Sequence, residues 1–72
     1  MSTATTLSVT VNGEPRRVTA GASIAAMLRE LGIEPARVAV ERNLTIVPRS
    51  TLDQAAVENG DQFEIVHFVG GG

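Results

Sequence analysis

The sequence predicts an α+β fold, with a mixed sheet of four to five strands and one helix packed across one face of the sheet. Three observations support this prediction. Two strand-like segments flank an Asn-Gly pair near the N-terminus, one amphipathic helical segment follows them, and short apolar segments separated by turn residues fill the second half. With 72 residues the chain has room for one domain. The expected order of elements is ββαβββ.

The first two strands are predicted from residue alternation and from the turn between them. Residues 7–11 (LSVTV) alternate apolar and polar side chains, which is the period of a strand with one buried face. Asn12 and Gly13 follow at once, and both residue types accept the positive φ of a tight hairpin turn. Pro15–Thr19 then returns as the second strand. The small, polar residues 1–5 are expected to form a flexible N-terminal extension.

One helix is predicted over Ser23–Leu31. Its apolar residues recur at the i, i+3, i+4 and i+7 spacing of a single helical stripe: Ile24, Met27, Leu28 and Leu31. Ser23 suits the N-cap position, where its hydroxyl would accept a hydrogen bond from an unpaired backbone amide. Gly32 suits the left-handed residue that ends many helices. The apolar stripe is expected to lie on the sheet, because nothing else in the chain can cover it.

The second half of the chain predicts three further strands. The segments 38–40 and 44–47 are expected to form short strands, and 50–54 is expected to form one helical turn. Asn59–Asp61 is a strong turn signal. Gln62–Phe68 is the last strand and the most apolar segment after the helix.

The predicted order allows the last strand to pair beside the first, which places both strands in the centre of the sheet. A hairpin, a helix across one sheet face and a central last strand make up the ubiquitin-like β-grasp layout. The domain is expected to span residues 6–68, with residues 69–72 as a flexible C-terminal tail. The predicted core comprises Leu7, Val9, Val11, Val18, Ile24, Leu28, Leu31, Val40, Ile46, Phe63 and Ile65.

Composition excludes several kinds of site. The chain has no cysteine, which excludes a disulfide, a thiolate zinc site and a cysteine nucleophile, and it has no lysine for a Schiff base. A net charge of −2 and two aromatic residues argue against nucleic-acid binding. His67 alone makes no metal site, and Asp61 is expected to cap its turn. Without a targeting segment or an apolar run of about 20 residues, a cytoplasmic monomer with no membrane contact is expected.

The C-terminal residues Phe68–Gly72 do not resemble a structural element. Three glycines carry high backbone entropy and bury no side chain, so this tail is expected to move freely. Val69–Gly72 would reach about 13–14 Å when extended. The reactive group at its end, the α-carboxylate of Gly72, is ionised at neutral pH and resists nucleophilic attack, so a separate enzyme would have to activate it. A frayed terminus or a leftover linker is the alternative explanation.

Two segments resemble the sulfur carriers of thiamine biosynthesis. Residues 38–49 (VAVERNLTIVPR) are similar to the central motif of that family, and residues 60–66 with the terminal FVGGG are similar to its C-terminal motif. The opening strands, the Asn-Gly turn and the helix fit the same pattern, so the resemblance covers residues 7–72. Glu41 and Arg42 depart from it, because relatives often carry apolar residues there. The strand around them is therefore expected to be partly exposed.

The resemblance implies a sulfur carrier and not an enzyme. The family's terminal glycine, here Gly72, is adenylated by a separate ubiquitin-activating-type adenylyltransferase that uses ATP and magnesium. It then becomes a thiocarboxylate with sulfur from a cysteine desulfurase or another donor, and it passes the sulfur to thiazole synthase. Gly71 and Gly70 would be threaded with Gly72 into the partner's site. No tightly bound cofactor is expected.

Candidate partner contacts lie near the end of the last strand. Val66 and Phe68 are expected on the face without the helix, where an apolar patch would dock the activating enzyme or pack under a loop. Val69 and Arg49 are the other candidates, although a solvated Arg49 fits the sequence equally well. Three other functions stay open: the small sulfur-carrying subunit for molybdopterin synthesis, a modifier conjugated to partner lysines through Gly72, and an interaction domain with an inert tail.

Overall fold

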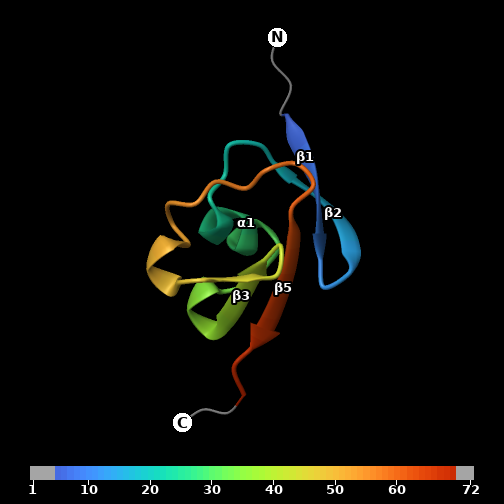
Figure 1. Cartoon of the computed structure of the whole chain (residues 1–72). Helices are drawn as coiled ribbons and strands as arrows, with labels where there is room; N and C mark the ends of the chain where they lie inside the picture. The colour runs from blue at the N-terminus through green and yellow to red at the C-terminus, as the bar shows by residue number, and fades with distance from the viewer. Residues whose placement is uncertain (1–4, 70–72) are drawn as a thin grey trace.

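The computed structural model describes residues 5–69, which form one sheet and one layer of helix (Figure 1). In chain order the elements are β1 (Thr6–Val11), β2 (Glu14–Thr19), α1 (Ile24–Glu30), the 3₁₀ turn η1 (Pro35–Arg37), β3 (Val38–Arg42), β4 (Thr45–Val47), the 3₁₀ turn η2 (Arg49–Thr51) and β5 (Gln62–His67). The order ββαβββ is confirmed. Most of the predicted N-terminal extension and C-terminal tail, residues 1–4 and 70–72, lies outside the described residues.

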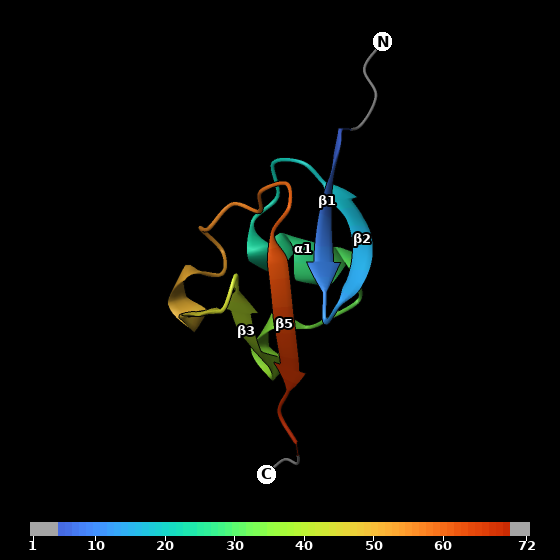
Figure 2. The same cartoon turned by 45° about the vertical axis from the view of Figure 1, so that its right-hand side comes forward.

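The strands form a five-stranded sheet in the order β2-β1-β5-β3-β4. β1 and β5 lie side by side in the centre and run parallel, whereas the other neighbours are antiparallel (Figure 2). α1 crosses one face of the sheet (Figure 2). This is the predicted β-grasp layout, and it gives β5 a neighbouring strand on both sides.

The local signals for the first hairpin and for the helix are confirmed. Asn12 and Gly13 have positive φ angles of 51° and 84° in the turn between β1 and β2. Ser23 caps α1, because its Oγ accepts a hydrogen bond from the Ala26 amide at 3.1 Å. Gly32 follows the end of the helix with a φ of 82°, as predicted.

The hairpin of β3 and β4 differs from its predicted boundaries. β3 extends two residues beyond the predicted segment 38–40, to Arg42. β4 begins at Thr45 and not at Leu44, because Leu44 lies in the connecting turn with a φ of 72°. Asn43, the other residue of this turn, has a φ of 51°. The two positive φ angles match the type of turn that joins two strands most tightly.

Two later elements also differ from their predicted bounds. The helical turn predicted over 50–54 is the 3₁₀ turn η2, which begins at Arg49 and ends at Thr51. β5 ends at His67, although the Phe68 amide still donates to the Arg37 carbonyl at 2.9 Å. None of the helices within residues 5–69 has the length and apolar character needed to cross a bilayer.

The core lies between α1 and the sheet. The predicted core residues that are buried are Val9, Val11, Val18, Ile24, Leu28, Val40, Phe63 and Ile65, while Leu7 and Leu31 are half-buried against them. The prediction for Ile46 is wrong, since this residue is 73% exposed. Ile46 lies in the edge strand β4 and pairs with Glu41 of β3. Its side chain projects from the opposite face to that of its neighbour Val47, which packs on the core.

The segment between η2 and β5 supplies two core residues that the pattern did not predict, Leu52 and Val57. The same segment offers backbone acceptors to the start of α1. The Leu52 carbonyl accepts a hydrogen bond from the Ala25 amide at 2.8 Å, and the Ala55 carbonyl accepts one from the Ile24 amide at 2.9 Å. The first amides of a helix have no partner inside it, so these bonds satisfy them while the segment closes one end of the core.

Candidate functional site at the end of β5

The candidate site is the point at which β5 leaves the sheet. The Phe68 amide donates a hydrogen bond to the Arg37 carbonyl at 2.9 Å, which continues the pairing one residue past β5. Val69 is the last described residue and is 96% exposed. Figure 1 shows this end of the chain projecting away from the body of the domain. The predicted sulfur-bearing residue and its threaded neighbours, Gly72, Gly71 and Gly70, lie outside the described residues.

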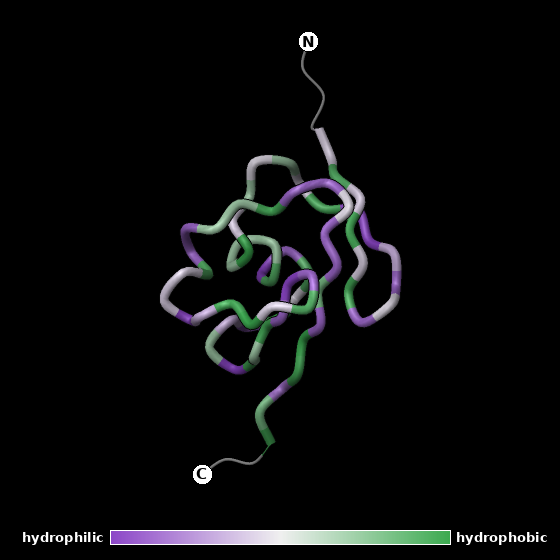
Figure 3. The backbone as a smooth tube through the Cα atoms, in the orientation of Figure 1, coloured by the Kyte–Doolittle hydropathy of each residue, from purple (hydrophilic) through white to green (hydrophobic). Residues whose placement is uncertain are grey.

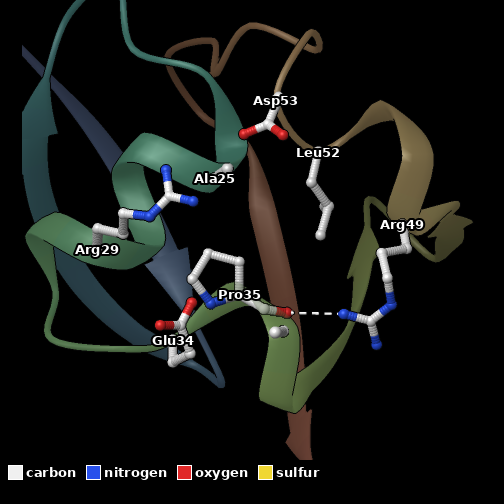
Figure 4. Close-up of a pocket in the computed structure, with 8 residues that line it drawn as sticks. Ala25, Arg29, Glu34, Pro35, Arg49, Leu52 and Asp53 are labelled. Carbon is white, nitrogen blue, oxygen red and sulfur yellow. Dashed lines mark hydrogen bonds between the residues drawn. The ribbon is translucent and has the colours of Figure 1, made fainter.

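Arg49, the first residue of η2, supports the point where the chain leaves β5. Its Nη1 donates to the Pro35 carbonyl at 3.0 Å, as Figure 4 shows, and its Nη2 donates to the Val38 carbonyl at 3.4 Å. Its guanidinium carbon lies 5.4 Å from the centre of the Phe68 ring, within the range of a cation–π contact. The structure thus gives Arg49 three contacts inside the chain. Its role in partner binding stays a prediction.

Arg49 also lines a shallow hollow of about 190 Å³ between α1, η1 and η2 (Figure 4). Arg29, Glu34 and Asp53 bring both signs of charge to its walls. The hollow is smaller than the pockets that enclose most small-molecule ligands. Among residues 5–69, no group of three or more His, Asp or Glu side chains is arranged to hold a metal ion.

Asn12, at the end of β1, holds β5 in place. Its Oδ1 accepts a hydrogen bond from the Ile65 amide at 2.7 Å, and its Nδ2 donates to the Ile65 carbonyl at 3.2 Å. Its backbone amide donates to the Phe63 carbonyl at 2.8 Å. The side-chain amide therefore acts as one more peptide group in the parallel pairing of β1 with β5. The contact joins residues 53 positions apart, so the local pattern, which assigns Asn12 to the turn alone, does not reveal it.

Asp61 fixes the other end of β5. Its carboxylate accepts a hydrogen bond from the Glu58 amide at 2.9 Å, which confirms the predicted capping of the turn. The same carboxylate pairs with the Arg42 guanidinium at 2.9 Å and accepts a bond from Asn43 Nδ2 at 3.2 Å. Arg42 also donates to the Ala56 carbonyl at 2.9 Å. The buried Asp61 thus ties the β3–β4 hairpin to the start of β5, a role that the sequence did not reveal.

The face of the sheet without the helix carries an apolar surface beside the exit. Its members, here called the outer-face patch, are Ala39, Ile46 and Val66, which line a hollow of about 190 Å³. Val66 and Phe68 are 63% and 58% exposed, so their predicted exposure is confirmed. Ile46, predicted in the core, belongs to this surface instead. Figure 3 shows hydrophobic residues continuing past β5 to the last described residues.

Two carboxylates flank the outer-face patch. Glu41 of β3 pairs directly with Glu64 of β5 in the antiparallel register, so both side chains leave the sheet on one face. Both residues line the same hollow as Ile46 and Val66. Glu41 is half-buried, as expected from its charge in a strand. The ion pairs found within residues 5–69 involve other residues, so neither glutamate has a cationic neighbour at ion-pair distance there.

Comparison with known proteins decides the family. The family model described as the ThiS family matches residues 9–72, which include most of the sheet and the C-terminal glycines. The chain belongs to the ThiS family. Its sheet and helix are arranged as in the ubiquitin-like β-grasp fold.

A solved structure and several sequences resemble this ThiS chain. The crystal structure of the thiamine biosynthesis protein ThiS from Geobacter metallireducens matches with a TM-score of 0.75 and 33% identity, over 92% of this chain and 100% of that one. Over 66 residues, this chain is 50% identical to thiazole synthase of Paramagnetospirillum magneticum and 42% identical to that of Magnetococcus marinus. Those matches cover 92% of this chain and 20% of each relative, so the chain spans about a fifth of their length. The protein ycf40 of Porphyra purpurea is 32% identical over 92% of this chain and 93% of its own length.

The two motifs that carry the ThiS resemblance meet at the exit of β5. Arg49 ends the central motif and Phe68 belongs to the C-terminal motif, and their side chains lie in contact. Within the central motif, Val47 packs on the core while Ile46 is exposed. In the described part of this ThiS chain, Arg49 thus supports the end of β5, and the chain continues from there to the exposed Val69.

Proposed function

We propose that this ThiS chain carries sulfur as a thiocarboxylate on Gly72 and delivers it for formation of the thiazole part of thiamine. The family match that extends through residue 72 carries the proposal. The position of Val69, which continues from a central strand and is exposed to solvent, supports it. Glycines beyond that point have no Cβ, so a partner's backbone and a nucleotide could approach the final carboxylate closely.

The proposed chemistry begins with the ionised carboxylate of Gly72. One carboxylate oxygen attacks the α-phosphorus of ATP, which forms an acyl-adenylate and releases pyrophosphate. A hydrosulfide equivalent then attacks the acyl carbon and expels AMP, which leaves a thiocarboxylate. If the donor is a persulfide, the product of the attack is an acyl disulfide, and a further thiol reduces it to the thiocarboxylate.

The activating enzyme in this proposal is a separate adenylyltransferase of the ubiquitin-activating type. It provides the site for ATP and magnesium, while this chain is the protein substrate and performs no catalysis. A cysteine desulfurase or another donor supplies the sulfur. We place the reaction in the cytoplasm, where ATP is available to the activating enzyme.

Thiazole synthase is the proposed sulfur acceptor. Two bacterial proteins named thiazole synthase contain a stretch, one fifth of their length, that is similar to nearly all of this chain. A carrier-like stretch within a protein of that name supports a working relationship between the two. Linking a carrier to its acceptor would raise the effective concentration of the reactive end at the acceptor's site.

The outer-face patch and the residues at the exit are the proposed docking surface for these partners. Val66 and Phe68 are exposed apolar residues next to the chain end, and Ile46 extends this surface across β4. Burying such residues in a complex removes apolar area from water and favours association. Their closeness to Val69 would let a partner hold the domain and receive the chain end together.

The experiment that tests the proposal measures the mass of the intact chain. The protein is incubated with ATP, magnesium, a ubiquitin-activating-type adenylyltransferase and a sulfur source, with omission of ATP as one control. The expected result is the mass gain of one sulfur replacing one oxygen, located on Gly72 by fragmentation. A second control carries one residue added after Gly72, which blocks the carboxylate and should prevent the gain.

Three outcomes separate the candidate functions. A gain of sulfur that transfers to thiazole synthase supports the proposal. Conjugates of higher mass, joined through Gly72 to lysines of other proteins, would instead identify a protein modifier. An unchanged mass for the natural chain end, under conditions in which an established carrier is converted, would overturn the proposal.

A further inference from the structure

We propose that Arg49 is a positioning residue, which forms with Phe68 a clasp that sets the point where the C-terminal segment leaves the domain. This inference rests on the proposed function, because the position of the exit matters when Gly72 has to reach a partner's active site. The clasp is defined as the Arg49 guanidinium, the Phe68 ring and the backbone of residues 35–38 between them.

The guanidinium makes its hydrogen bonds to one short segment of backbone. Nη1 bonds to the Pro35 carbonyl at 3.0 Å, and Nη2 bonds to the Val38 carbonyl at 3.4 Å. The Arg37 carbonyl, between these two, accepts the bond from the Phe68 amide. Arg49 therefore braces the same backbone that holds the first residue after β5. A planar guanidinium has donors in a fixed fork, so it can hold two carbonyls at once.

The flat face of the same guanidinium remains available for an aromatic ring. The Phe68 ring centre lies 5.4 Å from the guanidinium carbon, and the ring is more than half exposed. The core does not enclose this ring, and the contact with Arg49 is one restraint on it. Hydrogen bonds in the guanidinium plane leave its faces free, so they are compatible with a cation–π contact to the ring.

The clasp restricts the C-terminal carboxylate only if the chain that follows the clasp is short. Four residues, Val69–Gly72, follow Phe68, and they span at most about 13–14 Å. If the clasp opens, the chain pivots from a point further back in β5, and the carboxylate samples a larger volume. Ordering each additional residue in the complex has an entropic cost, so the reactive end enters the partner's site less readily.

The test begins with a measurement that does not depend on activity. In Arg49→Ala, the backbone order parameter of Phe68, measured by ¹⁵N relaxation, is expected to fall from a value typical of ordered backbone toward values below about 0.6. The Phe68 amide should also exchange with solvent faster. Arg29→Ala is the matched control, since it removes an arginine that lines the same hollow, while the cation–π contact found within residues 5–69 involves Arg49. Arg29→Ala should leave both measurements unchanged.

The second part uses the adenylation assay. Arg49→Ala is expected to raise the KM for the carrier about tenfold at unchanged kcat, because the lost ordering affects binding before the chemical step. Arg49→Lys keeps the charge and loses the fork, so it should restore little of the loss. Phe68→Ala should raise the KM as well. The KM of the double variant should be no higher than that of the single variant with the larger KM, because both changes open one clasp.

Several outcomes would overturn the inference. An unchanged Phe68 order parameter in folded Arg49→Ala, or in Arg49→Lys if the alanine variant does not fold, would show that no clasp exists. If the KM increase of the double variant equalled the product of the two single-variant increases, Arg49 would act independently of Phe68, for example by contacting the partner. If the natural chain is not adenylated at all, the proposed function fails, while the relaxation measurement still decides whether the clasp holds Phe68.

Discussion

Asn12 and Ile65 are joined by two hydrogen bonds between a side-chain amide and a backbone. Asn12 Oδ1 accepts from the Ile65 amide at 2.7 Å, and Asn12 Nδ2 donates to the Ile65 carbonyl at 3.2 Å. The parallel register of β1 with β5 ends at Val11 and Phe63, so this side chain continues the pairing after β1 has turned away. The hairpin turn thereby holds the strand that leads to the exposed Val69.

Replacing Asn12 by glycine tests this connection. Asn12→Gly keeps the positive φ of the turn and removes only the side chain, so the Ile65 amide and carbonyl lose their partners. We expect a loss of about 1–2 kcal/mol in the free energy of unfolding, measured by urea denaturation, with faster hydrogen exchange at the Ile65 amide. Unchanged stability and unchanged exchange would show that water replaces the side chain without cost.

The ion pair of Arg42 with Asp61 should contribute more than the exposed pair of Arg16 with Glu14. The Arg42 and Asp61 side chains are 23% and 7% exposed, and their charged atoms lie 2.9 Å apart. In the exposed pair, the Arg16 and Glu14 side chains are 51% and 73% exposed, and their charged atoms lie 3.5 Å apart. Arg42→Met should lower the free energy of unfolding by about 1–3 kcal/mol, since it leaves a buried carboxylate short of a partner. Arg16→Met is the control and should change it by less than about 0.5 kcal/mol. Equal effects would contradict this ranking.

The facing carboxylates of Glu41 and Glu64 should destabilise the isolated domain. Because like charges that lie directly opposite on neighbouring strands repel, Glu64→Gln should raise the free energy of unfolding by about 0.2–1 kcal/mol at low ionic strength. Salt screens such repulsion, so the gain should shrink in 1 M NaCl, where the screening length is about 3 Å. Denaturation curves at both salt concentrations measure it, and a gain that grows with salt would argue against repulsion as its origin.

The β3–β4 turn contains a residue in an unfavourable backbone conformation. Leu44 has a φ of 72°, a region that disfavours residues with a Cβ, and it is 86% exposed. Leu44→Gly should therefore stabilise the domain by about 0.5–1 kcal/mol, the steric relief being partly offset by the added freedom of the unfolded chain. Thermal denaturation measures the change.

Asn43→Gly is the matched control for this turn. Asn43 also has a positive φ, but its side chain accepts a bond from the Gln62 amide at 2.9 Å and donates to Asp61. The substitution should lower stability, because it removes these bonds. If both glycine variants shifted stability in the same direction, backbone strain at Leu44 would not be the explanation.

The outer-face patch should affect partner binding more than folding. Val66→Thr keeps a β-branched side chain of similar size in β5 and adds a hydroxyl on the exposed face, so stability should change by less than about 0.5 kcal/mol. If the patch docks the activating enzyme, the KM for adenylation should rise severalfold. Thr10→Val, on another strand, is the control for a simple change in surface hydropathy. An unaltered KM for folded Val66→Thr would exclude this residue from the docking surface.

Local sequence signals were sufficient for the elements whose cause is local. The turn at Asn12 and Gly13 depends on the φ preferences of those two residues, and the helix depends on its Ser23 cap and on a stripe repeated within nine residues. The order of these elements then favoured one layout, since an amphipathic helix between two hairpins has a single sheet to cover. The family motif pointed to the C-terminal glycines for a similar reason, because the motif is contiguous in sequence.

Contacts between distant segments decided the rest. A three-residue edge strand is too short for residue alternation to show which face it buries. Only the register with β3 places Val47 on the core and Ile46 outside. Charged pairs such as Arg42 with Asp61, 19 positions apart, leave no periodic trace in the sequence. The same holds for Arg49 and Phe68, which meet only because η2 folds back over the start of β3. Side-chain chemistry and local preference act over a few neighbouring residues, whereas the brace around the exit of β5 exists only once the sheet has assembled.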